Sequence, residues 1–137
     1  MTFGLHRKLA GLALVLVLLV AACSSGSDTA TIELVSPSEA AQVIEDDQAG
    51  LVVLDIRTPE EFNEARLANA INVDYYDADF ADQLDGLDKN APYVMYCRSG
   101  NRSSEAVQTM KDLGFVEVYE IDGGIVNWYD AGYPVEQ

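Results

Sequence analysis

The sequence predicts a single α/β domain built on a parallel β-sheet with helices on both faces. Short apolar segments, typical of buried strands, alternate with segments of helical pattern from residue 31 onward. This alternation indicates parallel strands, because the connection between two parallel strands usually runs through a helix on one face of the sheet. Residues 23–137 are enough for one compact domain, and the sequence contains no internal repeat.

Five segments are predicted to be strands: residues 31–35, 51–56, 70–73, 92–96 and 116–121. The second is apolar throughout except for Asp55, as expected of a central strand in a parallel sheet that is covered on both faces. The fourth is also strongly apolar and ends just before Cys97. We therefore expect both of these strands to be buried.

Helices are predicted in the intervals between the strands. The first starts at Ser36 with Pro37 in its first turn, a favoured position for proline. The second starts at Thr58, which is followed three residues later by Glu61 in the pattern of a capping box. The third covers residues 77–87, where apolar side chains recur at the i, i+4 and i+7 positions of one helical face. Two more are expected over residues 103–113 and 125–131.

Residues 1–22 have the pattern of a secretory signal peptide. Arg7 and Lys8 precede an apolar run over residues 9–22. As a helix this run would be about 21 Å long, which is shorter than the roughly 30 Å hydrocarbon core of a bilayer. A signal peptide is therefore favoured over a transmembrane helix. In the simplest case this is an ordinary signal that is cleaved after an alanine, and Cys23 has no special role.

The end of this run, Val20-Ala21-Ala22-Cys23, resembles the lipobox of bacterial lipoproteins. In those proteins the cysteine is lipidated and becomes the first residue of the mature chain. The resemblance implies a signal peptide over residues 1–22, lipidation of Cys23, a polar tether over residues 23–30 and a domain over residues 31–137. We expect the protein in the cell envelope, anchored to a membrane and facing outside the cytoplasm.

The charge of the chain excludes several partners. The net charge is −15, and removal of Arg7 and Lys8 with the signal peptide leaves 6 basic and 23 acidic residues, a net charge of −17. Nucleic acid is therefore excluded as a partner, and an anionic membrane surface would repel the domain, so that a membrane could hold it only through the lipid. The one histidine, His6, also leaves with the signal, and no metal site is expected.

The most informative segment surrounds Cys97, where an apolar strand leads into a polar loop and then into a helix. The N–H groups and partial positive charge of a helix N-terminus favour a thiolate over a thiol. Arg98 and Arg102 flank the loop and act in the same direction, and Gly100 permits a tight turn. A buried core cysteine is the alternative, but two arginines beside it disfavour that interpretation.

This segment resembles the active-site loop of the rhodanese family of sulfurtransferases. The family pattern cysteine-arginine-x-glycine-x-arginine-serine is matched by Cys97-Arg98-Ser99-Gly100-Asn101-Arg102-Ser103. Residues 54–62, 70–73, 122–128 and 131–135 are also similar to family segments, so that the resemblance covers about residues 31–135. The chain differs at Ala65-Arg66-Leu67, where the family usually has glycine-histidine-isoleucine.

The resemblance implies a rhodanese-like fold and an enzyme that works by covalent catalysis. The Cys97 thiolate would take a sulfur atom from a small anionic donor such as thiosulfate, and a thiol or cyanide would remove it from the persulfide. Backbone N–H groups of residues 98–102 would surround the sulfur. Arg98 and Arg102 would attract the oxyanion, with Ser103 and an Asp55–Arg57 ion pair in support. No metal or organic cofactor is implied.

Two other functions remain open. The first is a cysteine-dependent phosphatase or arsenate reductase on the same fold. Phosphatases of the cysteine-x5-arginine class have five residues between the cysteine and the arginine, whereas Arg102 comes one position earlier and Ser103 occupies the expected place. The second is a non-catalytic module that binds anions or senses redox state through oxidation of Cys97.

Overall fold

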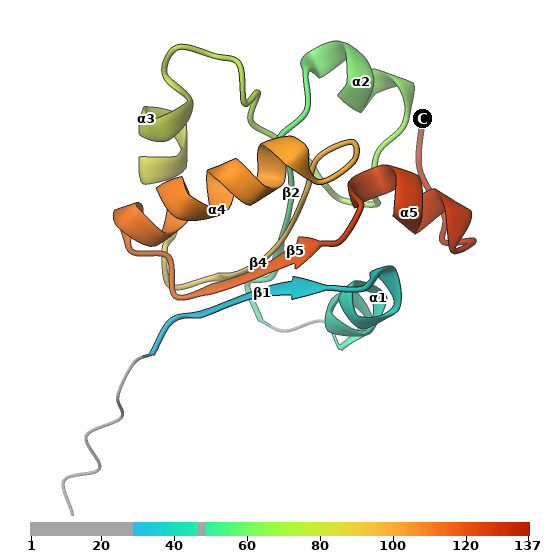
Figure 1. Cartoon of the computed structure of the whole chain (residues 1–137), viewed down its shortest axis with the longest axis horizontal. Helices are drawn as coiled ribbons and strands as arrows, with labels where there is room; N and C mark the ends of the chain where they lie inside the picture. Colours follow the sequence, from blue (N-terminus) through green and yellow to red (C-terminus); the bar gives the residue numbers. More distant parts are fainter. Residues whose placement is uncertain (1–28, 47–48) are drawn as a thin grey trace, which may run out of the picture.

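The computed structural model describes residues 29–46 and 49–137 and contains five strands and five helices within these ranges. The strands are β1 (Thr31–Val35), β2 (Val52–Asp55), β3 (Ile71–Asn72), β4 (Pro92–Tyr96) and β5 (Glu117–Ile121). The helices are α1 (Pro37–Glu45), α2 (Pro59–Glu64), α3 (Phe80–Asp85), α4 (Asn101–Leu113) and α5 (Gly124–Asp130). Figure 1 shows their arrangement.

The strands form one sheet in the order β1-β5-β4-β2-β3, and every neighbouring pair is parallel. Strand β4 lies in the middle, paired with β2 on one side and β5 on the other. Because the strands are parallel, their carboxyl ends all lie at one edge of the sheet. The polar loops that follow β2 and β4 are therefore brought together at that edge, as expected for ligand sites in such sheets.

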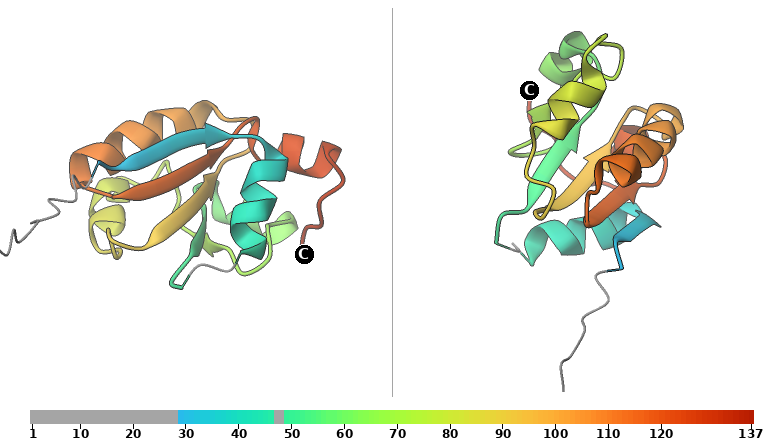
Figure 2. Two further views of the ribbon diagram at one scale, coloured as in Figure 1. Left: turned by 90° about the horizontal axis from the view of Figure 1, so that it is seen from below. Right: turned by 90° about the vertical axis from the view of Figure 1, so that its left-hand side faces the viewer.

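Helices cover both faces of the sheet, as the sequence predicted (Figures 1 and 2). Side chains alternate between the two faces along a strand. In β4, Tyr93 and Met95 pack in the cluster that includes residues of α3 and α4, whereas Val94 and Tyr96 pack in the cluster that includes residues of α1 and α5. All five residues of β4 are buried, which explains its uninterrupted apolar sequence.

Local sequence signals explain where the helices begin. The Thr58 side chain accepts from Glu61 N–H while the Glu61 carboxylate accepts from Thr58 N–H, so that the predicted capping box is present at α2. Helix α4 begins at Asn101, two residues earlier than predicted, because Gly100 adopts a left-handed conformation with φ of 99° and acts as its N-cap. A glycine adopts this conformation at little cost.

Strand β3 is shorter than the predicted segment 70–73. It forms only two residue pairs with β2, and it lies at the edge of the sheet. The Asn72 side-chain amide then donates to the carbonyl oxygens of Asp55 and Arg57 at 3.0 and 2.8 Å. Beyond β3 the contact with the β2 segment continues through two backbone bonds, from Val73 N–H to Asp55 O at 3.0 Å and from Tyr75 N–H to Ile56 O at 3.2 Å.

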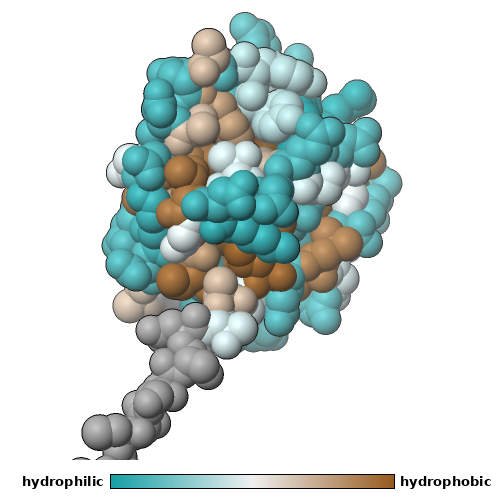
Figure 3. Space-filling model, turned by 60° about the vertical axis from the view of Figure 1, so that its left-hand side comes forward, coloured by the Kyte–Doolittle hydropathy of each residue, from teal (hydrophilic) through white to brown (hydrophobic). Residues whose placement is uncertain are grey.

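The surface is largely hydrophilic on the face drawn in Figure 3, where separate areas of hydrophobic residues lie between hydrophilic ones. Within residues 29–46 and 49–137, no helix is long and apolar enough to cross a membrane. The predicted signal peptide, the lipidation site Cys23 and most of the tether lie outside the residues that the structure describes.

Candidate active site

Cys97 lies at the carboxyl edge of the sheet, directly after β4, as predicted, and its side chain is buried with 1% exposure. The backbone around it packs against the first turn of α5. Ile125 N–H donates to Cys97 O at 2.9 Å, and Val126 N–H donates to Arg98 O at 3.2 Å. Gly124 has φ of 60°, and a Cβ there would lie 2.3 Å from Cys97 O. The second glycine of the Gly123-Gly124 pair therefore permits close contact between the two segments.

The Cys97 sulfur accepts a hydrogen bond from Gly100 N–H at 3.1 Å, and it lies 3.4 Å from the Ser103 hydroxyl. Burial alone would raise the pKa of the thiol. Hydrogen bonds from Ser103 and from loop N–H groups outweigh burial, so that the pKa of Cys97 is lowered from its ordinary value. The loop therefore favours the thiolate through hydrogen bonding, which agrees with the sequence-based expectation.

The remaining loop side chains divide into two groups. Arg98, Ser99 and Asn101 are exposed at the mouth of the loop, where they can meet a ligand. Ser103, in contrast, is fully buried in the first turn of α4. Within the described residues, no three histidine, cysteine, aspartate or glutamate side chains are placed to hold a metal ion.

Arg102, which the resemblance assigns to the oxyanion, already has an anionic partner in the fold. Its guanidinium forms two hydrogen bonds with the Glu61 carboxylate of α2, at 2.7 and 2.9 Å, and its side chain is only 13% exposed. It also lies over the Tyr76 ring at 5.5 Å. The hydrogen bond from Arg102 lowers the pKa of Glu61 to about 2. Arg102 therefore joins α4 to α2, and its charge acts beside the cysteine from within an ion pair.

The predicted Asp55–Arg57 ion pair is present and buried behind the loop. Arg57 Nη2 and Asp55 Oδ2 are 2.6 Å apart, with side-chain exposures of 6% and 0%. The same guanidinium donates to Ala65 O and lies over the Tyr96 ring at 5.5 Å. Burial opposes its charge, but the hydrogen bond with Asp55 prevails and the pKa of Arg57 is raised. The pair fixes the loop after β2 against β4, the strand that directly precedes Cys97.

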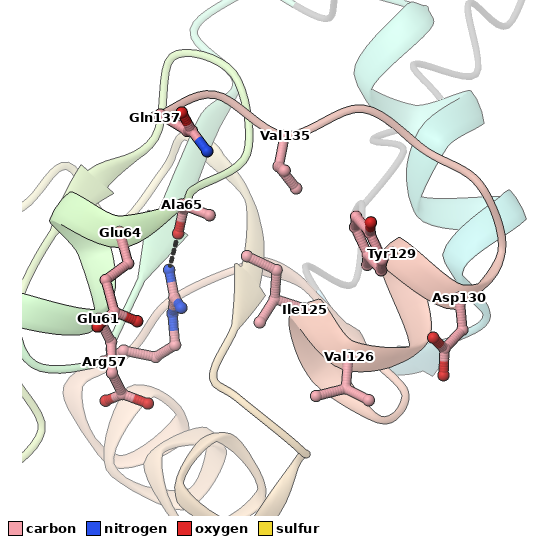
Figure 4. Close-up of a pocket in the computed structure, with 10 residues that line it drawn as sticks. All are labelled: Arg57, Glu61, Glu64, Ala65, Ile125, Val126, Tyr129, Asp130, Val135 and Gln137. Carbon is pink, nitrogen blue, oxygen red and sulfur yellow. Dashed lines mark hydrogen bonds between the residues drawn. The ribbon is translucent and has the colours of Figure 1, made fainter.

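A cavity of about 360 Å³ lies between α2 and α5 (Figure 4). Arg57, Glu61 and Ala65 line one side of it, and Ile125 and Val126 line the other. Two lining groups connect this cavity to the cysteine loop, because Glu61 binds Arg102 and the N–H of Ile125 binds Cys97 O. The cavity thus shares its walls with the supports of the loop.

Sequence reasoning missed Glu120, which is located in β5 and is only 6% exposed. Its Oε1 atom accepts from the Ser103 hydroxyl at 2.6 Å. Burial raises the pKa of this carboxyl and outweighs the hydrogen bond from Ser103, which lowers it, and Asp122 raises it further. The available signal was an acidic residue two positions after Val118, on the face of β5 that α4 covers.

Comparisons with known proteins agree with this arrangement. A family model described as the rhodanese-like domain matches residues 36–131. A thiosulfate sulfurtransferase GlpE from Pseudomonas syringae is 36% identical over 101 residues, which cover 73% of this chain and 90% of the relative. A second GlpE, from Pseudomonas aeruginosa strain LESB58, is 32% identical over 106 residues, which cover 77% of this chain and 91% of the relative.

Solved structures show the same fold. A rhodanese-related protein from Thermoplasma volcanium is similar with a TM-score of 0.66 and 29% identity, over 76% of this chain and 97% of that protein. A protein from Rhodopseudomonas palustris described as a possible tyrosine phosphatase has a TM-score of 0.62 and 27% identity, over 77% of this chain and 85% of that protein.

Proposed function

This chain belongs to the family of rhodanese-like domains and is a rhodanese-type sulfurtransferase, and we propose that it moves a sulfane sulfur through a persulfide on Cys97. The observation that supports the persulfide most directly is the hydrogen bond from Gly100 N–H to the Cys97 sulfur, together with the contact of 3.4 Å between that sulfur and Ser103 Oγ. The relatives named thiosulfate sulfurtransferase suggest thiosulfate as a donor. The acceptor is a small thiophilic nucleophile, such as a thiol or cyanide.

In the first step, the Cys97 thiolate attacks the outer sulfur of thiosulfate. A new sulfur–sulfur bond forms on Cys97, and sulfite leaves with the electron pair of the bond that breaks. The lowered pKa of Cys97 supplies the nucleophile, and the N–H groups of the loop face the transferred sulfur. Exposed Arg98 meets the oxyanion, whereas Arg102 contributes its charge from within its ion pair with Glu61.

In the second step, the acceptor attacks the outer sulfur of the persulfide and the Cys97 thiolate leaves. The same loop groups that favour the original thiolate favour it as a leaving group, since they stabilise negative charge on sulfur. Neither step requires a proton to be added to or removed from the protein. The cycle therefore returns the enzyme directly to its reactive state.

Transfer of a phosphoryl group is the second candidate, because one structural neighbour is described as a possible tyrosine phosphatase. The arginine of this chain comes one position earlier than the cysteine-x5-arginine pattern requires. Its guanidinium is also occupied by two hydrogen bonds to Glu61, so that it is not free to hold phosphoryl oxygens. Both observations favour sulfur transfer over phosphate-ester hydrolysis.

Attachment to a membrane through a lipid on Cys23 is the proposed location of the enzyme. The lipobox-like sequence supports this, and so does the polar tether that follows it. The start of β1 lies at the edge of the parallel sheet opposite the end of β4, as can be followed in Figure 1, and Cys97 directly follows β4. A domain held at its N-terminal end would therefore present the Cys97 loop away from the bilayer.

The decisive experiment is to measure thiocyanate formation from thiosulfate and cyanide by the purified protein and by Cys97→Ser. We expect turnover by the wild type only, and negligible hydrolysis of p-nitrophenyl phosphate by either protein. Phosphatase turnover that depends on Cys97 and exceeds sulfur transfer would overturn the proposal. Absence of both activities would favour a binding or redox-sensing module.

A further inference from the structure

A buried carboxylate lies behind the nucleophile and has no role in the two transfer steps described above. Glu120 Oε1 is 2.6 Å from Ser103 Oγ, and Ser103 Oγ is 3.4 Å from Cys97 Sγ. All three side chains are at least nine-tenths buried. One hydroxyl therefore bridges the reacting sulfur and a carboxyl group that is shielded from water.

The fold accounts for this chain of contacts. Glu120 in β5 pairs in register with Met95 in β4, and Cys97 follows two residues after Met95. Met95, Cys97 and Val118 share the sheet face that α4 covers, and Glu120 is two residues beyond Val118, so that its side chain lies on this face as well. Ser103, in the first turn of α4, contacts both Cys97 and Glu120 through its hydroxyl group.

We propose that Glu120 is a positioning residue that receives the thiol proton of Cys97 through the hydroxyl of Ser103. The S–H bond of Cys97 breaks and its proton passes to Ser103 Oγ, while the hydroxyl proton of Ser103 passes to the Glu120 carboxylate. The products are a thiolate, an unchanged hydroxyl and a neutral carboxylic acid. The three groups together keep a charge of one negative unit, which moves from Glu120 to sulfur.

The surroundings favour this direction of transfer. Burial raises the pKa of Glu120 and outweighs the hydrogen bond from Ser103, which lowers it, and the carboxylate of Asp122, the first residue after β5, raises it further. At Cys97 the pKa changes in the opposite direction, because the hydrogen bonds of the loop lower it. The positive charge of Arg102 also interacts with the Cys97 sulfur. The residues paired with Glu120 across the sheet, Leu34 in β1 and Met95 in β4, are uncharged.

This proton relay, from Cys97 through Ser103 to Glu120, rests on the proposed function only in taking Cys97 as the nucleophile. Once the proton is on Glu120 it stays there, because neither attack on thiosulfate nor transfer to the acceptor uses a proton. The consequence is measurable in the resting enzyme. Between the two ionisations of the Cys97–Glu120 pair, the thiolate fraction is set by an internal equilibrium and does not vary with pH.

The alternative is a purely structural hydrogen bond. Ser103 Oγ also lies 3.2 Å from Gly100 O, and a hydroxyl that donated there or to a permanently ionised Glu120 would not exchange a proton with sulfur. Under this alternative, Cys97 titrates alone. The substitution Glu120→Gln distinguishes the two, because glutamine preserves the size and the hydrogen bond but cannot take up the proton.

The first test is the rate of alkylation of Cys97 by iodoacetamide as a function of pH in the full-length protein, which does not require sulfur transfer. The wild type should show two ionisations with a flat region between them. Glu120→Gln and Ser103→Ala should show one ionisation, with a rate that changes about tenfold per pH unit below it. Glu117→Gln, the same substitution at the other end of β5, should behave as the wild type, because Glu117 binds Tyr119 and not Ser103.

The second test is infrared difference spectroscopy of wild type against Glu120→Gln at neutral pH. The relay predicts the C=O band of a protonated carboxylic acid in the wild type, absent from the variant and shifted in Ser103→Ala. A single ionisation shared by wild type and Glu120→Gln, or the absence of the acid band, would overturn the relay. If Glu120→Gln fails to fold, two measurements still test the relay. One is the dependence of the alkylation rate on pH in Ser103→Ala, and the other is the acid band of the wild type, recorded against alkylated wild-type protein. Loss of sulfur transfer with an intact flat region would reject the proposed function but not the relay.

Discussion

Replacing Glu61 with glutamine removes one charge from the ion pair that joins α2 to the cysteine loop. Glutamine is accepted at the third position of a capping box, so that the cap at Thr58 is preserved. The change therefore isolates the contact with Arg102, whose guanidinium binds both carboxylate oxygens of Glu61. We expect the variant to fold but to be less stable than the wild type at neutral pH.

The magnitude follows from the pKa of Glu61. The hydrogen bond from Arg102 lowers this pKa to about 2 in the folded protein, against about 4.3 in an unfolded chain, which corresponds to about 3 kcal/mol. The Glu61 side chain is 26% exposed and its partner is 13% exposed, so solvent screens part of the interaction. We therefore expect the free energy of unfolding to fall by about 1–2 kcal/mol in Glu61→Gln.

The sign of the pH dependence provides a second test. The folded pKa lies below the unfolded one, so the stabilisation is fully present above about pH 4.3 and is lost as the pH falls toward 2. Urea denaturation of wild type and Glu61→Gln should give a difference that is constant at neutral pH and shrinks in acid. Glu64→Gln, an exposed glutamate in the same helix, serves as the control for charge removal. Equal effects of the two substitutions at every pH would refute the assigned role of the ion pair.

Four other predictions follow from the loop, its support and the chain's N-terminal segment. Incubation with thiosulfate should add the mass of one sulfur atom to the wild type, reversibly by cyanide, whereas sulfur loading of Cys97→Ser would remove Cys97 from the mechanism. Arg98→Ala should weaken thiosulfate turnover by about 1.5–3 kcal/mol and change the free energy of unfolding by less than about 1 kcal/mol, with Lys111→Ala as the control; a large loss of stability at unchanged turnover would make Arg98 structural. Gly124→Ala should destabilise the protein by about 1–3 kcal/mol in urea, because a Cβ there would lie 2.3 Å from Cys97 O; wild-type stability would contradict this packing. Cys23→Ser should release the protein from membranes in cell fractionation or leave the precursor unprocessed, and normal processing with membrane attachment would exclude the lipid anchor.

The parts of the fold that could be predicted are those in which one local signal sufficed. The buried strands β2 and β4 were recognised from apolar runs, since a strand covered on both faces has no polar alternation. The start of α2 was recognised from the spacing of Thr58 and Glu61. Cys97 was placed correctly at the carboxyl edge because a strand, a glycine-containing loop and a helix follow one another directly in the sequence.

The ends of strands and helices were less predictable because they depend on contacts with other parts of the chain. Strand β3 is limited by the two residue pairs that it forms with β2, and the Asn72 side chain then bonds to the loop after that strand. Helix α4 begins at Asn101 because of the backbone conformation of Gly100. Neither the register of an edge strand nor the φ of one glycine is determined by the pattern of apolar residues.

Two features of the site could not be deduced because the local sequence around each acidic residue gives no sign of its distant partner. Glu61 was explained as a helix cap, yet the same carboxylate also binds Arg102, 41 residues away. Arg102 was therefore assigned to the substrate anion, whereas in the folded protein its guanidinium binds the Glu61 carboxylate. Glu120 lies in the predicted strand 116–121 and matches no motif, yet Ser103 of α4 packs against it and donates a hydrogen bond to its carboxyl group. In both cases an acidic residue in a strongly acidic chain gains its role only from the element packed on it, and that packing is determined by the sheet order rather than by the local sequence.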